Sequence, residues 1–265
     1  MRSNSFPSRS AVPRALADES CDFHSAIRNS ASRRRKLTQA LGCSPAMTEP
    51  ETAPPVAARL TRASLASAAS LLAQRDASPA AIIARNGLPP LWARPAGFAT
   101  LTRIVLEQQV SLASAAALYR RVAGELPGGW TVDAVLSVGV SGLRGSGLTR
   151  QKAAYVTALA EWIARGDLRL SSLVRAPDAQ VSATLTRVPG IGPWTASIYL
   201  VMALGRPDVW PLGDLALHKA LTKFGCLSQL PSSDVAARLA ERWAPYRAVA
   251  ARILWHGYLA DRAAA

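Results

Sequence analysis

Residues 185–196 read Leu-Thr-Arg-Val-Pro-Gly-Ile-Gly-Pro-Trp-Thr-Ala, and this stretch decides the fold. An apolar segment runs into the Pro-Gly-Ile-Gly of residues 189–192, and a second segment begins at Pro193, where the first position of a helix tolerates proline. Glycine permits positive φ and a close backbone approach. The second segment repeats apolar side chains at helical spacing, namely Trp194, Ile198, Val201 and Met202. The stretch therefore predicts two helices joined by a tight glycine hairpin, over about residues 183–204.

The hairpin also predicts a place for an anion. The N-terminus of its second helix leaves backbone N–H groups without partners, and these groups attract negative charge. Neither Gly190 nor Gly192 has a side chain that would block a phosphate. Such a site holds the nucleic-acid backbone without reading bases. The alternative is a plain tight turn between two helices.

Composition supports a polyanionic partner. The 265 residues contain 31 Lys and Arg against 17 Asp and Glu, a formal net charge of +14. This excess favours nucleic acid, an anionic membrane or a ribosome, although a bias toward Arg and Ala also raises it. No apolar run is long enough to cross a bilayer, so we expect no membrane contact. Cys21, Cys43 and Cys226 form no metal-binding or disulfide pattern, which fits a reducing intracellular setting.

The chain divides in composition near residue 48. Residues 1–48 are rich in Ser and Arg and are predicted to be a disordered basic segment. A targeting peptide, a DNA-tethering arm and an artefact of start-site choice, with Met47 as the true start, remain open readings of it. Residues 49–265 form the predicted core, whose pattern is helical almost throughout. One weak strand candidate lies at residues 208–211.

The hairpin and its surroundings resemble the helix-hairpin-helix DNA glycosylases that carry a Gly/Pro-rich loop and a catalytic aspartate, the HhH-GPD superfamily. Within it, the likeness is to the alkylation-repair family of 3-methyladenine DNA glycosylase II, and it covers most of residues 95–260. The matching blocks, in order, are residues 107–111, 147–154, the hairpin, 211–219, and 243–247 through Trp255. The resemblance implies an all-α, two-lobed core. The N-terminal β domain of some members is not expected, because residues 1–95 are too short and too helical.

Asp214 stands where this family has its catalytic aspartate. It follows Trp-Pro-Leu-Gly at residues 210–213 and precedes a helical pattern, so it also suits a helix N-cap. The two roles are compatible, because an N-cap carboxylate is oriented and negative charge is stabilised at that end of a helix. Breaking an N-glycosidic bond builds positive charge on the sugar, which a fixed carboxylate stabilises.

Trp194 occupies the position where bifunctional relatives have a Schiff-base lysine. The chain is therefore expected to lack lyase activity. The resemblance implies a base pocket with aromatic walls, for which cationic bases have affinity. Its candidates are Trp194, Ile198, Trp210, Tyr246 and Trp255, although core packing is an equal reading of each tryptophan. Relatives have an aromatic residue where this chain has Ile198, so the pocket is expected to differ in shape.

Further contacts are implied by the same resemblance. Gln109 matches the residue that fills the gap left by a flipped base, or it is only a helix-junction residue. The expected DNA contacts are Gln109, Ser111, Lys152, Gly190, Ile191, Gly192, Trp194 and Thr195. The carbonyls of Thr186, Val188 and Ile191 are candidate ligands of a monovalent cation, Na⁺ or K⁺. No other cofactor and no iron–sulfur cluster is expected.

These observations predict a monofunctional DNA glycosylase that excises alkylated purines of the 3-methyladenine and 7-methylguanine type from double-stranded DNA in base-excision repair. The sequence offers no convincing general acid, and alkylated purines are already cationic and leave without protonation. The alternatives are a glycosylase for an oxidised, deaminated or mismatched base, and a non-catalytic DNA-binding protein. We expect a monomer in the cytoplasm, associated with a bacterial nucleoid, with organellar targeting by residues 1–48 left open.

Overall fold

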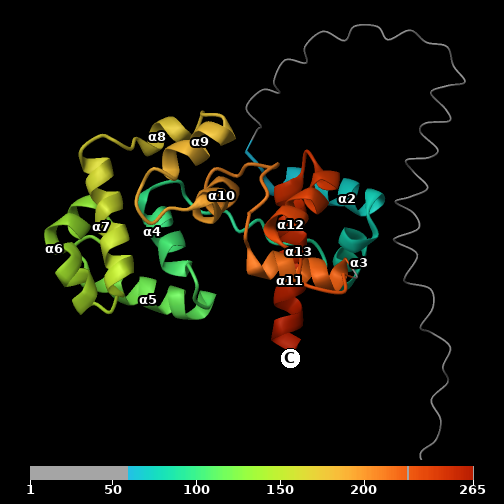
Figure 1. Cartoon of the computed structure of the whole chain (residues 1–265), viewed down its shortest axis with the longest axis horizontal. Helices are drawn as coiled ribbons and strands as arrows, with labels where there is room; N and C mark the ends of the chain where they lie inside the picture. Colours follow the sequence, from blue (N-terminus) through green and yellow to red (C-terminus); the bar gives the residue numbers. More distant parts are fainter. Residues whose placement is uncertain (1–58, 226, 265) are drawn as a thin grey trace, which may run out of the picture. The chain divides into compact units, whose positions relative to one another are not determined.

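The computed structural model of the chain describes residues 59–225 and 227–264, all within one structural unit that spans residues 54–265 (Figure 1). Every regular element in the described ranges is a helix, which confirms the all-α prediction. The strand candidate at residues 208–211 was wrong: these residues form bends and coil. The described ranges contain no strand with which these residues could pair. Asp208 forms a side-chain contact, in which its carboxylate accepts from the Arg247 guanidinium. The predictions for residues 1–48 lie outside the described residues.

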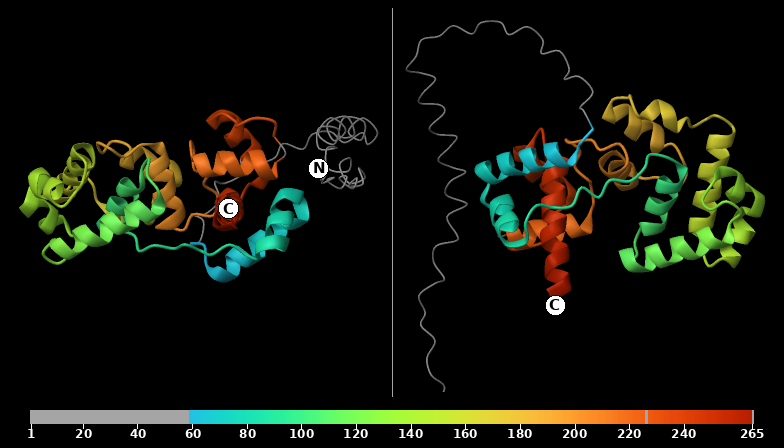
Figure 2. Two further views of the ribbon diagram at one scale, coloured as in Figure 1. Left: turned by 90° about the horizontal axis from the view of Figure 1, so that it is seen from below. Right: turned by 180° about the vertical axis from the view of Figure 1, so that it is seen from behind.

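The helices form two groups by their packing, which matches the two predicted lobes (Figures 1 and 2). The first group contains α2 (Arg62–Arg75), α3 (Ala77–Asn86), α11 (Leu215–Phe224), α12 (Ser233–Ala240), the 3₁₀ turn η1 (Glu241–Trp243) and α13 (Arg247–Ala264). The second contains α4 (Phe98–Glu107), α5 (Leu112–Glu125), α6 (Val132–Gly145), α7 (Arg150–Ala164), α8 (Leu170–Leu173), α9 (Asp178–Leu185) and α10 (Pro193–Met202). The first group therefore combines elements from both ends of the described sequence.

Local capping chemistry starts many of these helices. Thr61 and Ser64 form a capping box at α2, and Thr149 accepts from the Lys152 amide at the start of α7. Asp214 caps α11 in the same way. Side-chain oxygens at these positions satisfy amides that a first turn leaves unpaired. The sequence thus fixes where the helix that carries Asp214 begins.

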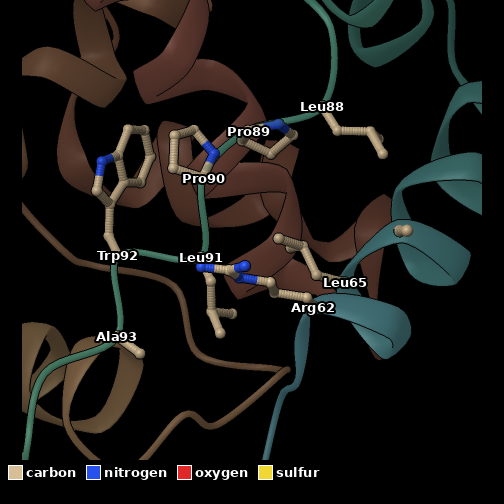
Figure 3. A pocket seen from close by; sticks show the side chains of 9 residues that line it. Arg62, Leu65, Leu88, Pro89, Pro90, Leu91, Trp92 and Ala93 are labelled. Carbon is tan, nitrogen blue, oxygen red and sulfur yellow. The ribbon is translucent and has the colours of Figure 1, made fainter.

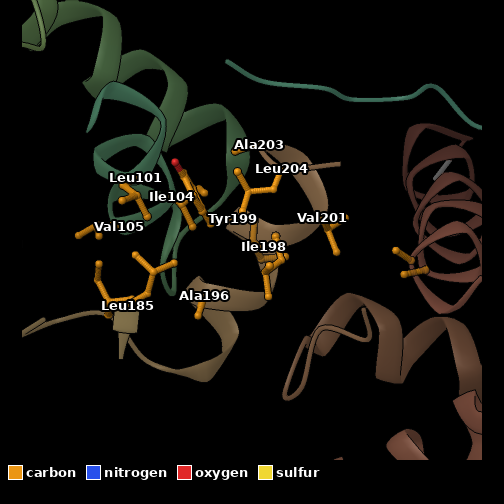
Figure 4. Packing of buried hydrophobic residues seen from close by; sticks show 14 of the residues in the cluster. Leu101, Ile104, Val105, Leu185, Ala196, Ile198, Tyr199, Val201, Ala203 and Leu204 are labelled. Atoms are coloured by element: carbon orange, nitrogen blue, oxygen red, sulfur yellow. The ribbon is translucent and has the colours of Figure 1, made fainter. Parts of the chain in front are cut away.

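The core of the second group is built around α10. Seven of its residues, Thr195 to Val201, are buried. The helix packs against α4 and α9, which contribute Leu101, Ile104 and Leu185 to the same buried cluster (Figure 4). A helix with apolar residues on all sides is stable only in such a setting. The hairpin therefore leads directly into a buried helix.

Arg252 joins the end of α10 to α13. Its guanidinium is only 1% exposed and donates to the carbonyls of Leu91, Val201 and Ala248 at 2.7–3.0 Å. Burial lowers the pKa of Arg252 to about 10, so it is charged at neutral pH. Buried charges persist only when their donors are satisfied. Because three carbonyls meet that need, Arg252 holds α13 to α10 and to the connection before α4.

Candidate active site

The predicted hairpin is present between α9 and α10. Gly190 adopts φ +86°, a conformation that L side chains rarely adopt. A Cβ at this position would also overlap the ring of Tyr155, at 2.1 Å from its Cγ. Gly190 is therefore required both by its backbone conformation and by the packing of the hairpin on α7.

Gly192 differs from Gly190 because nothing crowds it. It is exposed and extended, and no atom lies within 4 Å of where its Cβ would be. Gly192 is the N-cap of α10, but no side-chain bond caps this terminus in the described part of the chain. The first amides of α10 are thus left for an external acceptor, as an anion site requires.

Gln108 ties the α4–α5 loop to the hairpin. Its Nε2 donates to the Gly190 carbonyl and to Thr195 Oγ1, both at 2.9 Å. The adjacent Gln109 is exposed and has φ +56°, which is uncommon for a residue with a side chain. Gln108 therefore attaches the α4–α5 loop to the hairpin. The loop carries the predicted gap-filling residue Gln109, and the hairpin is the predicted phosphate site.

Asp214 is the centre of the site. Its carboxylate is 8% exposed and accepts three hydrogen bonds. Oδ1 accepts from the Leu217 amide at 2.9 Å and from Trp255 Nε1 at 3.1 Å, and Oδ2 accepts from Trp194 Nε1 at 3.0 Å. The donors come from α11, α13 and α10, so both helix groups contribute. Bonds from several directions to an anionic acceptor fix the carboxylate in one orientation.

Trp194 and Trp255 have a geometry that their sequence positions did not reveal. Both were candidate pocket walls, and both also aim an indole N–H at Asp214. Trp194 is half-buried, whereas Trp255 is 8% exposed. A tryptophan that bonds a carboxylate through its edge keeps its face free to pack on another ring.

The other three pocket candidates do not bond Asp214. Trp210 is buried against Trp243, with ring centroids 5.8 Å apart, which fits the core-packing reading. Ile198 lies in the hydrophobic core with 4% exposure (Figure 4). Tyr246 is half-buried against that core. Their contribution to a base pocket stays a prediction.

Two predicted DNA contacts have partners inside the protein. The Lys152 ammonium donates to the Leu106 carbonyl at 2.7 Å, at the end of α4, and burial lowers the pKa of Lys152. Ser111 caps α5 by accepting from the Ser114 amide at 3.1 Å. Both side chains therefore stabilise the ends of the loop that carries Gln109.

Sequence reasoning missed two residues of this site. Gln108 was part of the 107–111 block, but only the structure shows its bonds to the hairpin. Trp92 packs edge-on against Trp255, with ring centroids 6.5 Å apart and planes at 71°. No spacing rule links it to Trp255, because the two residues belong to elements far apart in sequence.

The candidate cation ligands lie in the turn that precedes α10. The Val188 carbonyl accepts from the Ile191 amide at 3.0 Å. A carbonyl oxygen has a second lone pair, so this bond leaves the Val188 carbonyl able to coordinate an ion.

Two other kinds of feature were not found in the described ranges. No group of His, Cys, Asp and Glu side chains there has a metal-binding arrangement. No helix there is long and apolar enough to cross a membrane.

Comparison with known proteins decides the family. A model of the HhH-GPD superfamily of base excision DNA repair proteins matches residues 102–245, a range that contains the hairpin and Asp214. The chain belongs to this superfamily. The HhH-GPD match confirms the resemblance that the hairpin and its surrounding blocks carried.

Two individual relatives are named for the same kind of enzyme. YfjP of Bacillus subtilis (strain 168), named as a candidate DNA-3-methyladenine glycosylase, is 31% identical over 162 residues. The match covers 58% of this chain and only 56% of YfjP. The crystal structure of a Bacillus halodurans DNA-3-methyladenine glycosidase has a TM-score of 0.59 and 30% identity, and covers 72% of this chain and 89% of that one.

A further solved structure shows the same fold. The Schizosaccharomyces pombe 3-methyladenine DNA glycosylase Mag1, in a complex with abasic DNA, has a TM-score of 0.67 and 24% identity. The match covers 71% of this chain and 95% of Mag1. The described helices of this chain therefore share the fold of the Mag1 structure.

Proposed function

We propose that the protein is a monofunctional DNA glycosylase that hydrolyses the N-glycosidic bond of alkylated purines in double-stranded DNA. The observation that carries this proposal is the Asp214 carboxylate, held by two tryptophan indoles and a helix amide. An oriented, largely buried anion is the group that stabilises a developing sugar cation. The relatives named for 3-methyladenine and the Mag1 complex with abasic DNA support the choice of substrate.

Docking would begin at the hairpin. The uncapped start of α10 offers its amides to a phosphate, and Gly192 leaves room for close approach. Gln109, presented on a loop attached to the hairpin, would then fill the space of the extruded nucleotide. Extrusion is necessary because the reacting bond is inaccessible to the enzyme while the base is stacked.

Bond cleavage would follow at Asp214. As the C–N bond lengthens, positive charge develops on the sugar and the base leaves with the bonding electrons. The carboxylate stabilises that charge until water adds to the sugar carbon and loses a proton. A purine methylated at N3 or N7 leaves as a neutral base, because it already carries the positive charge. This chemistry needs no separate proton donor.

The absence of strand cleavage is part of the proposal. Trp194 stands in the position of the Schiff-base lysine, and its indole nitrogen is committed to Asp214 Oδ2 at 3.0 Å. An indole N–H has no basic lone pair with which to attack the sugar. The product strand would therefore retain an intact abasic site.

The turn before α10 supports a second part of the proposal. We propose that the carbonyls of Thr186, Val188 and Ile191 hold Na⁺ or K⁺, which would add positive charge beside the phosphate site. No other cofactor is required by the chemistry above. The monomeric state and the association with a nucleoid stay predictions.

The test is a base-release assay on duplexes that each carry one lesion. The panel contains 3-methyladenine, 7-methylguanine, hypoxanthine, uracil, 8-oxoguanine and a mismatch, and strands are analysed with and without alkali. We expect release of the two methylated purines and strand breaks only after alkali. If only an oxidised, deaminated or mismatched base were released, that base would replace alkylated purines as the assigned substrate. DNA binding without release of any base would indicate a non-catalytic protein, and breaks without alkali would exclude the monofunctional assignment.

A further inference from the structure

Two residues other than glycine have positive φ in the described parts of the chain, Gln109 and Trp92. Left-handed backbone is unfavourable for residues with a Cβ, and such strain is found preferentially at functional sites. Gln109 lies on the loop assigned to the flipped-base gap. Trp92, with φ +48°, lies in the connection between α3 and α4, to which the proposed reaction assigns no role.

The connection around Trp92 is held on both sides. Just before it, the Leu91 carbonyl accepts from Arg252 Nε at 3.0 Å, and just after it, the Arg94 amide donates to the Met202 carbonyl at 2.8 Å. Pro89 and Pro90 restrict the backbone upstream. These contacts come from α13 and α10, the two helices that provide indole donors to Asp214. They offset the strain at Trp92.

The side chain of Trp92 is directed away from the side chain of Leu91 (Figure 3). The connection lines a cavity of about 530 Å³ together with Arg62 and Leu65 of α2, and Asp214 is not among the lining residues. The Trp92 ring is half-buried, and it packs edge-on against Trp255 and also against His256, whose centroid is 6.3 Å away at 80°. The strained residue thus meets α13 at the residue that bonds Asp214.

We propose that Trp92 is a positioning residue that acts through Trp255 on the Asp214 carboxylate. The edge-on contact restricts the rotation of the Trp255 indole, whose N–H then points at Asp214 Oδ1. This inference rests on the proposed function. It adds Trp92 to the site as a third tryptophan. It also gives a reason why the positive φ of Trp92 is maintained in the connection between α3 and α4.

A role in filling space alone does not require this arrangement. A glycine could follow the same backbone path without the strain that a Cβ causes. An aromatic edge, by contrast, has a preferred direction toward the neighbouring ring, which an aliphatic side chain lacks. If Trp92 positions Trp255, Phe at position 92 should therefore retain more activity than Leu. If Trp92 only fills space, the two substitutions should have similar effects.

The experiment compares Trp92→Leu and Trp92→Phe with Trp130→Leu as the matched control. Trp130 stacks on Tyr119 at 5.4 Å in the second helix group and does not touch Asp214. Single-turnover release of 7-methylguanine, affinity for lesion DNA and the melting temperature are measured for each, at a temperature where all are folded. The Trp255 indole N–H resonance is followed by ¹⁵N NMR and assigned with Trp255→Phe.

We expect Trp92→Leu to slow base release about 2- to 10-fold, the range for one aromatic pair, and to shift the Trp255 resonance. Trp92→Phe should restore most of the rate. Trp130→Leu should lower the melting temperature without moving that resonance. A Trp92→Leu protein with wild-type rate and an unmoved resonance would overturn the inference, as would an equal resonance shift in Trp130→Leu.

The failure of this inference is distinguishable from failure of the proposed function. If the wild-type protein released no base, the glycosylase assignment would fail. The NMR comparison would still decide whether Trp92 acts on Trp255, and Asp214→Asn should shift the same resonance if the two side chains are bonded.

Discussion

The N-termini of α10 and α11 receive negative charge in opposite ways. At α10 the N-cap is Gly192, which has no side chain, and no side-chain bond caps the helix in the described residues. At α11 the N-cap is Asp214, whose own carboxylate bonds the Leu217 amide at 2.9 Å. Both termini have the same tendency to attract an anion. One is left open, and the other contains its anion within the protein.

The difference separates docking from catalysis. An open terminus can accept any phosphate, so α10 suits contacts that are independent of sequence. A terminus occupied by a carboxylate cannot accept a phosphate, but it fixes the charge that a sugar cation would need. Trp194 connects the two, because it lies in the first turn of α10 and donates to Asp214 Oδ2 at 3.0 Å. In the proposed reaction, DNA held at the α10 terminus would thereby lie near the α11 terminus.

The largest expected effect comes from removing the internal anion. Asp214→Asn keeps an oxygen that can cap α11, so the fold should be retained while base release falls on the order of 10²- to 10³-fold. Asp214→Ala should lose the same activity and also about 1 kcal/mol of stability with the cap. Single-turnover release and urea unfolding measure the two quantities. Full release by Asp214→Asn would remove Asp214 from the reaction, and equal unfolding midpoints for Asn and Ala would show that the cap contributes nothing.

A smaller effect should separate the two hairpin glycines. Gly190→Ala places a Cβ at φ +86° and against Tyr155, and should cost about 1 to 3 kcal/mol of stability. Gly192→Ala faces open space, so its cost should stay within about 1 kcal/mol, the loss expected for alanine at an N-cap. Its added methyl group should nevertheless weaken DNA binding about 3- to 10-fold, if a phosphate approaches there. Thermal melts and binding titrations test both, and wild-type DNA affinity in Gly192→Ala would place the phosphate elsewhere.

The smallest expected effect concerns the cation before α10. Replacing K⁺ and Na⁺ by choline at constant ionic strength should lower DNA affinity about 2- to 5-fold if the carbonyls of Thr186, Val188 and Ile191 hold an ion. Ionic strength must be fixed because phosphate contacts are themselves dependent on salt. The Asp214→Asn protein serves as the binding species, so that turnover does not interfere. Equal affinity in choline would exclude a cation that supports docking.

Local rules made much of this molecule predictable from its sequence. The hairpin followed from glycines and a proline at fixed positions, and α10 begins at Pro193 as expected. Asp214 was predicted as an N-cap because aspartate directly before a helical pattern favours that position, and it caps α11. The prediction of a strand at residues 208–211 was wrong, because a strand depends on a pairing partner that local sequence does not specify. Trp210 could not be separated from Trp255 by sequence, although one packs on Trp243 and the other bonds Asp214.

The sequence by itself determined the helices, the open and the filled terminus, and the absence of a lysine at Trp194, because each depends on a few neighbouring residues. Only the tertiary structure decided which side chains surround the carboxylate. The indoles of Trp194 and Trp255 converge on Asp214 from different helices, and Trp92 reaches Trp255 from a connection held by Arg252. Hydrogen bonds and ring contacts form over a few ångströms of space, and separation along the chain does not encode that proximity.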